Sequence, residues 1–544
     1  MSSNTKQVRK PELLAPAGGF EQLRYALYFG ADAVYLACDK FGLRQRAQNF
    51  SLADMPRAVQ MAHDAGAKVY VTLNAYLHDE DLSDLPEYLA ALAAAGVDAF
   101  IVSDLGVFAL AREHAPQVDL HISTQASVSN VEAARMWHRL GAKRIVTARE
   151  MSLEEIAQLK AELPDVEVEV FVQGAMCMAI SGRCLISDYL TGRSANQGNC
   201  VQPCRWSYHL EEQTRPGELF PIEEDERGTY IMNSKDLNML AHLDELIAAG
   251  VDSIKIEGRV KKAFYVATVV NAYRQVLDGG DPVQWGSELE RVSHRPYSTG
   301  FFYGDAQQSF EDDIYVQLYD WVAEVVESRP IEATATENDL DFTQGMWQTI
   351  VYCRNRFYEG DTLELLSPHC EVTPVLVVGL EEVFPVVDVR DDEGLDNPEL
   401  KDASASKQNE RCFDSSERAV AIANTIPVEV ANKAMGAYAF ITPSRFIVMT
   451  SCAPSGATPP RRTNRSNTLH ARCFLINRSF LASKCAWILC VSLGKWVHGD
   501  EACKQRALSL SLLWRWQYVL RSCSHFIHSP IRRYESSFAS VRAI

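Results

Sequence analysis

The chain begins with a long stretch, from Pro11 to about Asp278, in which short β-type runs alternate with helical patterns. In the helical segments, such as 85–96 and 237–250, apolar residues recur at i, i+3 and i+4, and each segment ends on glycine. The β-type runs number eight: 12–18, 33–38, 68–76, 98–104, 119–127, 143–150, 167–174 and 252–259. This alternation predicts parallel strands joined by crossover helices.

Two α/β architectures fit that alternation, a closed barrel and an open doubly wound sheet. Eight strands, with no GxGxxG after the first one, favour a (β/α)8 TIM-like barrel over residues 1–300. A further β-type run at 230–237 leaves the strand order open. In such a barrel, active residues lie at the carboxyl ends of the strands.

Polar residues stand at several of these predicted strand ends: Asn74, Asp104, Gln125, Arg149 with Glu150, and Glu257 with Arg259. One such residue alone most often caps a helix or bonds to a loop. A ring of them around a barrel mouth predicts an active site. Four are expected to be catalytic: Asn74, Gln125, Glu257 and Arg259.

An insertion of about 80 residues separates the last two predicted strands, and a connection of that length is usually functional. It carries four cysteines, Cys177, Cys184, Cys200 and Cys204, spaced C-x6-C-x15-C-x3-C. Structural zinc sites usually show two C-x2–4-C knuckles, and only the second pair fits one. Irregular spacing favours an iron–sulfur cluster over zinc, although zinc and unliganded thiols both stay open from spacing alone.

The pattern changes after the barrel. Residues 316–390 lose the helical periodicity and predict a small all-β barrel domain, followed by a linker or degraded segment at 391–430. In 431–544, Lys and Arg outnumber Asp and Glu by 16 to 3, and 6 of the 14 cysteines occur there. We interpret this tail as an out-of-frame or read-through product rather than a native domain; the alternative is a basic nucleic-acid-binding arm.

Composition narrows the class of protein. At 47% hydrophobic and 23% charged residues, the chain is typical of a globular protein, and its net charge of −18 disfavours indiscriminate binding to nucleic acid. We see no signal-peptide pattern and no apolar run of the roughly 18–20 residues that span a membrane, so a cytoplasmic protein is expected. Cysteines there are reduced or bind metal.

The segment 169–187, "EVFVQGAMCMAISGRCLIS", resembles the signature of the collagenase-like peptidases, peptidase family thirty-two. That signature has the form E-x-F-x2-G-[SA]-x-C-x4–6-G-x-C-x-x-S. Agreement extends to "LLAPAGGFEQLRYALYFGADAVYL", "VTLN", "HISTQAS", "SKDLNML" and "SIKIEGRVKKAFYVATVVNAYR", so the resemblance covers about residues 10–390.

The resemblance implies two competing activities. The older family label is protease. Bacterial members instead hydroxylate tRNA wobble uridine, 23S rRNA cytidine or the ubiquinone ring without oxygen, using a 4Fe–4S cluster and prephenate as the hydroxyl source. Carried over by position, Cys177 and Cys184 match the signature, and Cys200 and Cys204 are candidates for the remaining cluster ligands.

The residues favour the second activity. A protease needs an activated nucleophile or water, and neither HExxH, GxSxG nor a cysteine with an evident histidine partner is present. The two carboxylates of prephenate call for guanidinium groups. The candidate substrate-binding residues are Arg149, Arg183, Arg193 and Arg259, with Trp206 as a stacking partner for an RNA base.

The sequence therefore predicts a prephenate-dependent, oxygen-independent RNA hydroxylase that forms 5-hydroxyuridine at the tRNA wobble position. The alternatives are a collagenase-like peptidase that cleaves peptides and an RNA- or partner-binding protein with a structural metal, zinc being the second choice. The strong negative charge of residues 1–430 limits an RNA contact to a small basic patch, and a quinone substrate stays open. The sequence makes no prediction of oligomeric state.

Overall fold

A computed structural model provides the fold of this chain. It describes residues 9–43, 49–177, 179–180, 183–203, 209–211, 219–221, 235–304, 316–331, 346–368, 372–385, 422–434, 436–442 and 474–477.

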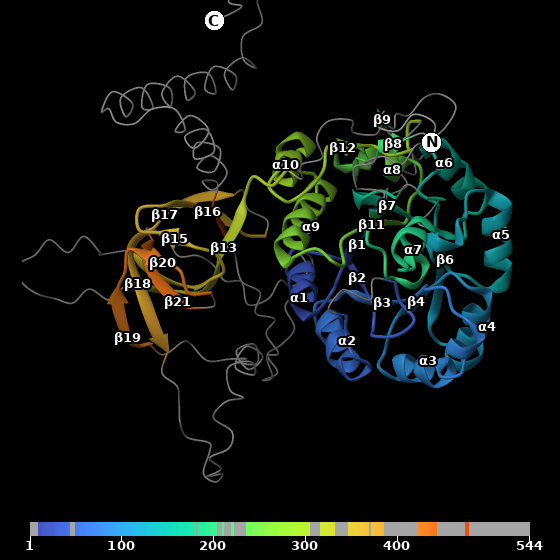
Figure 1. The fold of residues 1–544 in the computed structure, drawn as a ribbon, viewed down its shortest axis with the longest axis horizontal. Helices are drawn as coiled ribbons and strands as arrows, with labels where there is room; N and C mark the ends of the chain where they lie inside the picture. The colour runs from blue at the N-terminus through green and yellow to red at the C-terminus, as the bar shows by residue number, and fades with distance from the viewer. Residues whose placement is uncertain are drawn as a thin grey trace, which may run out of the picture. The chain divides into compact units, whose positions relative to one another are not determined.

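Eight parallel strands close into a barrel (Figure 1). They are β1 (Glu12–Pro16), β2 (Ala33–Leu36), β3 (Lys68–Leu73), β4 (Ala99–Val102), β5 (Asp119–Ile122), β6 (Arg144–Val146), β7 (Glu167–Ala175) and β11 (Ser253–Ile256). Neighbours pair in chain order, and β11 closes the ring by pairing with both β7 and β1. The eight predicted runs and the choice of a barrel over an open sheet are confirmed.

The run predicted at 230–237 overlaps a short extra strand, β10 (Asp236–Asn238). β10 pairs antiparallel with the end of β7 and parallel with β12 (Tyr297–Ser298), so it extends the sheet outside the barrel ring. Residues 230–234 lie outside the described residues.

Helices surround the barrel strands (Figure 1). They are α1 (Phe20–Tyr28), α2 (Met55–Asp64), α3 (Leu85–Ala94), α4 (Leu105–His114), α5 (Val131–Leu140), α6 (Leu153–Glu162), α8 (Leu243–Ala248), α9 (Ala263–Leu277) and α10 (Pro282–Leu289). Their apolar faces pack on the outer face of the strands in one large core. No helix in the described part of the chain is long and apolar enough to cross a membrane.

Four helices end on a glycine that turns the chain into the next barrel strand. Gly66, Gly96, Gly141 and Gly250 have φ values of 76°, 87°, 108° and 84°. Glycine adopts this left-handed conformation without steric cost, which explains why the same residue recurs at each joint.

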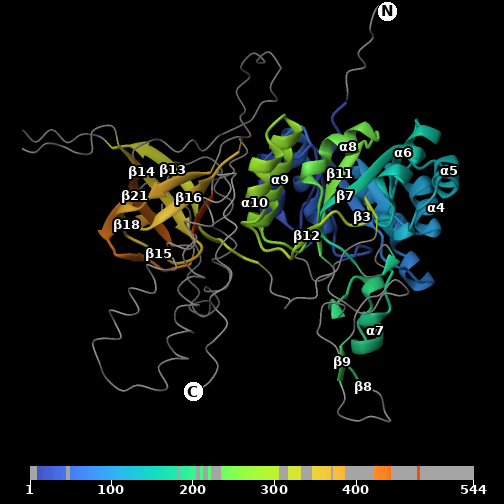
Figure 2. The same ribbon diagram turned by 90° about the horizontal axis from the view of Figure 1, so that it is seen from above.

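The long insertion lies at one end of the barrel (Figure 2). Its described elements are α7 (Ile186–Thr191) and an antiparallel pair, β8 (His209–Glu211) with β9 (Leu219–Pro221). The cysteine-bearing stretch up to Pro203 is described apart from residues 178 and 181–182. The rest of the insertion is described only in part.

The chain after the barrel forms antiparallel sheets. Within the described residues, the larger has eight strands: β13 (Asp320–Pro330), β14 (Trp347–Cys353), β16 (Thr362–Leu366), β17 (Thr373–Leu376), β18 (Val378–Pro385), β19 (Ile422–Pro427), β21 (Ala437–Thr442) and β22 (Phe474–Asn477). The smaller pairs β15 (Phe357–Tyr358) with β20 (Val430–Ala431). The sheets take in strands from the stretches assigned to linker and tail, and the division into domains stays a prediction. Residues 386–421, 443–473 and 478–544 lie outside the described residues.

Candidate active site

A cavity of about 150 Å³ opens at the carboxyl ends of the barrel strands. Five of the polar residues predicted to ring the mouth line it: Asn74, Gln125, Arg149, Glu257 and Arg259. Asp104 has a different place, because its carboxylate accepts hydrogen bonds from the backbone of Gly106 and Val107 and so caps α4. The structure thus gathers most of the predicted ring in one cavity, while the catalytic roles stay predictions.

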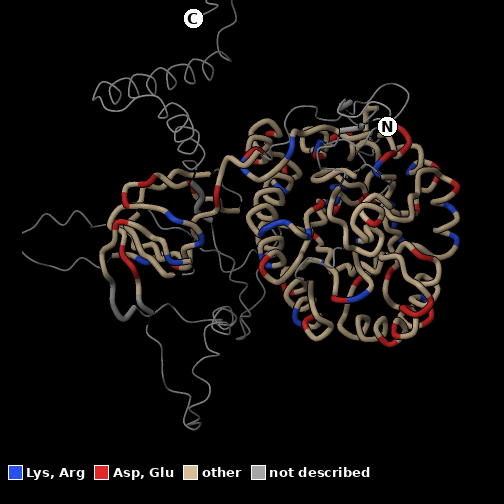
Figure 3. Tube along the Cα trace, viewed as in Figure 1, with Lys and Arg blue, Asp and Glu red and all other residues tan. Residues whose placement is uncertain are grey.

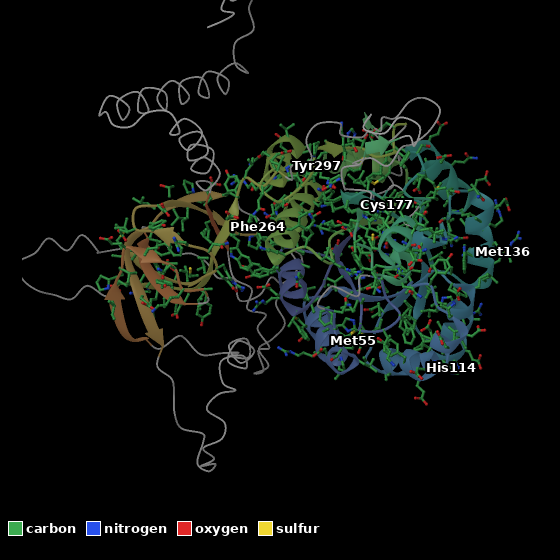
Figure 4. All side chains as sticks on the ribbon, viewed as in Figure 1. Met55, His114, Met136, Cys177, Phe264 and Tyr297 are labelled. Carbon is green, nitrogen blue, oxygen red and sulfur yellow. The ribbon has the colours of Figure 1, made fainter. Side chains whose placement is uncertain are left out.

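Three cysteines of the insertion line the same cavity: Cys177, Cys184 and Cys200. Each is half-buried and free of disulfide bonds. Cys177 lies two residues after the end of β7, near the middle of the ring of helices in the view of Figure 4. Short contacts hold the other two, since the backbone N–H of Cys184 donates to Asn196 Oδ1 at 3.2 Å and Gln202 N–H donates to Cys200 Sγ at 3.2 Å.

The pKa of the Cys184 thiol depends on its burial and on the two neighbouring thiols. Burial raises the pKa of the Cys184 thiol above its ordinary value, and the neighbouring Cys177 and Cys200 raise it further. Hydrogen bonds from the backbone after Cys184 act in the opposite direction and lower that pKa, without cancelling the increase. The thiols are therefore close enough to interact electrostatically.

This donor set suits a thiolate-bound metal, because soft sulfur ligands select iron–sulfur clusters and zinc. Within the described residues, no three His, Cys, Asp or Glu side chains are grouped tightly enough to hold a metal ion as they stand. The fourth predicted ligand, Cys204, lies outside the described residues. Three convergent thiols fit the chemistry of the predicted cluster, and the complete ligand set stays a prediction.

Two guanidinium groups line the cavity in different ways. Arg259, which is 6% exposed, donates to Thr72 Oγ1 at 3.4 Å and to the carbonyl of Leu43. Arg149 donates to the Ala175 carbonyl at 3.1 Å, and its Cζ lies 4.1 Å from the centre of the Phe171 ring. Both groups can offer N–H donors to a carboxylate that enters the cavity.

A hydrogen-bonded pair fixes another part of the cavity wall. Asn74 Nδ2 donates to Ser123 Oγ at 3.0 Å, and the same oxygen accepts from the backbone N–H of Gln125 at 3.3 Å. Arg183 lies outside the cavity lining, where its Nε donates to the Gln125 carbonyl at 2.8 Å and its Cζ lies 5.7 Å from the Tyr76 ring. Arg183 is thus tied to the wall rather than pointing into the cavity.

The other two predicted substrate-binding residues are not brought to this place. Arg193 is half-buried in the turn after α7 and does not belong to the cavity lining. Trp206 lies outside the described residues. Their proposed contacts with substrate stay predictions.

The similarity of this chain to known proteins identifies its family. The model of Peptidase family U32 matches residues 18–312, which include every barrel strand after β1 and the whole insertion. The chain belongs to this family. The resemblance drawn from the signature segment is thereby confirmed.

Named relatives of this U32 protein act on RNA. It is 39% identical over 381 residues to tRNA hydroxylation protein P1 of Bacillus subtilis, covering 68% of this chain and 86% of the relative. It is 36% identical over 406 residues to tRNA hydroxylation protein P of Escherichia coli, covering 66% and 86%. A 23S rRNA 5-hydroxycytidine synthase of Escherichia coli is 42% identical over 267 residues, covering 49% of this chain and 39% of that protein.

One part of this U32 site, the charged floor of the cavity, was not among the predicted residues. Lys255 of β11 lines the cavity and is 4% exposed, and its Nζ lies 2.9 Å from Oε1 of the fully buried Glu169. The other oxygen of Glu169 accepts from Arg144 at 3.0 Å. Lys255, Glu169 and Arg144 come from β11, β7 and β6, so no local sequence pattern brings them together.

Proposed function

We propose that this U32 protein is an RNA hydroxylase that forms 5-hydroxyuridine at the wobble position of tRNA. The observation that carries the proposal is the convergence of three thiols and two guanidinium groups on one cavity at the barrel mouth. Relatives named for tRNA hydroxylation, each matched over 86% of its length, support tRNA as the substrate. The rRNA synthase keeps ribosomal RNA as the second choice.

The proposal includes a 4Fe–4S cluster. Cys177, Cys184 and Cys200 would hold it from the cavity wall, with Cys204 as the fourth ligand. When bound, such a cluster supplies electron transfer or Lewis acidity beside the substrate. The thiols would then be occupied as ligands and would not act as free nucleophiles.

Prephenate is the proposed co-substrate. Its two carboxylates need cationic donors, and Arg149 and Arg259 both border the cavity. Charge-assisted hydrogen bonds of this kind are roughly twice as strong as neutral ones. The Asn74–Ser123 pair in the same wall would restrict how the bound acid can rotate.

RNA would meet the protein at the open end of the cavity. A base must leave its stack to reach a barrel mouth, and aromatic and guanidinium groups are the usual partners of an extruded base. Arg183 and the half-exposed Tyr76 lie side by side at this rim. Basic and acidic residues are interspersed around the helices of the barrel (Figure 3), so we expect a local rather than a broad RNA contact.

The family name favours a peptidase as the second candidate function. Among the residues that the structure describes, no histidine lines the cavity. A cysteine or serine nucleophile there would lack the histidine that most often serves as its base. We therefore rank proteolysis below hydroxylation.

The deciding experiment is nucleoside analysis of tRNA from cells that lack this protein. We expect 5-hydroxyuridine to disappear, to return with the wild-type gene, and to stay absent with Cys184→Ala. Cys353→Ala is the matched control, because Cys353 is buried in β14, away from the cavity, and should restore the nucleoside.

The outcomes separate the candidates. Unchanged 5-hydroxyuridine in the deletion strain would refute the tRNA assignment, and loss of 5-hydroxycytidine from 23S rRNA would replace it. Anaerobically purified protein that contains zinc and shows no iron–sulfur absorbance would refute the cluster. Gelatin or peptide cleavage that survives Cys184→Ala would establish a peptidase that works without it.

A further inference from the structure

Lys255 places a primary amine on the floor of the cavity, where the proposed function gives it no task. The side chain is almost fully buried, and its Nζ lies 4.4 Å from the centre of the Tyr35 ring and 5.4 Å from that of Phe171. Its carboxylate partner is Glu169, at 2.9 Å. The amine thus has an aromatic wall, one carboxylate and an open side toward the cavity.

Electrostatics make this amine unlike a surface lysine. Burial lowers the pKa of Lys255 below its ordinary value; Glu169 opposes that change, while the cations of Arg144 and Arg259 add to it. A lysine that is desolvated and near other cations holds its proton less firmly and becomes a nucleophile toward carbonyl groups.

The neighbouring cation shows which carbonyl compound would fit. Phe171 is contacted by Lys255 and also by Arg149, whose Cζ lies 4.1 Å from the ring centre. An amine and a guanidinium that share one ring can meet a ketone and an adjacent carboxylate of the same small molecule. A cavity of about 150 Å³ accommodates a molecule of the size of benzene, which matches the short head of a 2-oxo acid.

We propose that Lys255 forms an imine with the ketone carbon of a 2-oxo acid bound in the cavity, with Glu169 carrying the proton. This inference deepens the proposed function and rests on it in one respect: the proposed co-substrate, prephenate, is itself a 2-oxo acid. It identifies the chemical class that the cavity holds, whether or not RNA is the final acceptor.

The reaction balances without an oxidant or a reductant. Glu169 takes one proton from the Lys255 ammonium, and the nitrogen lone pair then forms a C–N bond while the C=O π pair moves to oxygen. That oxygen receives the proton from Glu169 and a second proton from nitrogen, and the C–O bond breaks to release water. One ammonium and one ketone thus yield one protonated imine and one water.

A second lysine in the same protein provides an internal comparison. Lys160 on α6 also pairs with a carboxylate, at 2.7 Å from Asp252 Oδ2, but it does not belong to the cavity lining. If Lys255 were only a structural ion pair, the two lysines would behave alike toward a 2-oxo acid.

The test uses the full-length protein with pyruvate and sodium cyanoborohydride, followed by peptide mass spectrometry. We expect a reduced adduct on Lys255 and none on Lys160, and no adduct with lactate, which lacks the ketone. Lys255→Arg keeps the charge opposite Glu169 and should abolish the adduct. Glu169→Gln should slow its formation by about 10²-fold, the usual size of a lost proton-transfer group.

Each contrary result is informative. Labelling of Lys160 to the same extent as Lys255, or no label on wild-type Lys255 with either pyruvate or phenylpyruvate, would overturn the imine. If the Glu169→Gln variant is labelled at the wild-type rate, Glu169 does not carry the proton in imine formation. Locating the adduct requires only the wild-type protein, without RNA. If the protein forms the adduct but its deletion leaves tRNA unchanged, the imine is supported and the RNA assignment is refuted.

Discussion

Two arginines lie at opposite ends of the barrel interior and have opposite surroundings. Arg144 belongs to β6, and Arg149 to the loop that follows β6. Arg144, nearer the amino ends of the strands, pairs with Glu12 at 2.7 Å, Glu167 at 2.8 Å and Glu169 at 3.0 Å. Arg149, at the mouth, donates to a backbone carbonyl and packs on Phe171, and no carboxylate of a described residue lies within ion-pair distance of it.

This barrel uses charge for stability at one end and keeps charge available for a ligand at the other. Arg144 is 4% exposed, and its carboxylate partners satisfy it completely, so little of its charge can act on a ligand. Arg149 is half-buried beside an open cavity, and a ligand carboxylate would complete its contacts. This agrees with the general division of such barrels into a stabilising amino end and an active carboxyl end.

Removing Arg144 should have the largest effect on stability. Arg144→Met leaves three carboxylates in the barrel interior without their shared cation, and breaking a buried ion pair by removing one partner costs about 3–5 kcal/mol. Urea unfolding of the purified protein measures this loss. The control is Arg135→Met on α5, because Arg135 pairs at the surface with Glu132 at 3.2 Å and Glu162 at 3.6 Å. That change should cost at most about 1 kcal/mol, and equal losses in both variants would contradict the role given to Arg144.

A smaller loss of stability is expected where the backbone at Gly18 passes close to Arg259. A Cβ added at Gly18 would lie 2.1 Å from the Arg259 carbonyl oxygen, so Gly18→Ala must displace the backbone at one of these two residues. Such overpacking costs about 1–3 kcal/mol, and it should also weaken binding of a 2-oxo acid.

The matched control for Gly18 is Gly286, which lies in α10 and has no atom within 4 Å of an added Cβ. Gly286→Ala should stabilise the helix by about 0.5–1 kcal/mol. Urea unfolding and pyruvate binding, measured for both variants, test the pair. If Gly18→Ala binds pyruvate like wild type, Arg259 does not depend on this close approach.

The barrel and its mouth were predictable because their signals are local in sequence. Eight apolar runs, with glycine at the joints, determine the strands, and polar residues directly after β3, β5, β6 and β11 line one cavity. Each of these features depends on a few consecutive residues and on the geometry that all parallel barrels share.

The charged floor was not predictable for a physical reason. In β11, Ser253 and Lys255 alternate with Ile254 and Ile256, a pattern that normally places the polar side in water. Here helices cover the outer face, so the isoleucines pack outward into the large core, and the polar side chains point into the barrel. The partners of Lys255 come from strands distant in sequence, and no local pattern identifies Glu169 as one of them.

Acid unfolding also tests the stabilising role of the Arg144 ion pairs. Burial alone would raise the pKa of Glu12, but the attraction and hydrogen bond of Arg144, helped by Tyr70, lower it below its ordinary value. A carboxylate with a lowered pKa stabilises the fold fully above the unfolded value of about 4.3 and loses that contribution as pH falls through the folded value.

We therefore expect wild type to lose stability as pH falls below about 4.3, and Glu12→Gln to lose less over the same interval. Urea unfolding at pH 5 and at pH 3 measures both slopes. Glu132→Gln is the control, since Glu132 pairs with Arg135 at the surface. A slope of Glu12→Gln equal to that of wild type would show that another carboxylate dominates acid unfolding.

The smallest effect on stability is expected at the mouth. Arg149→Met removes a half-buried guanidinium that has no described carboxylate partner and substitutes an apolar side chain that can still pack on Phe171. The change removes one hydrogen bond to a backbone carbonyl and no ion pair, and a single hydrogen bond contributes about 1 kcal/mol, so the free energy of unfolding should change by about 1 kcal/mol or less. The same variant should abolish 5-hydroxyuridine in the complemented strain, because a carboxylate ligand would lose its donor. A loss of stability as large as that of Arg144→Met would erase the contrast between the two ends, and normal 5-hydroxyuridine would show that Arg149 does not bind the co-substrate.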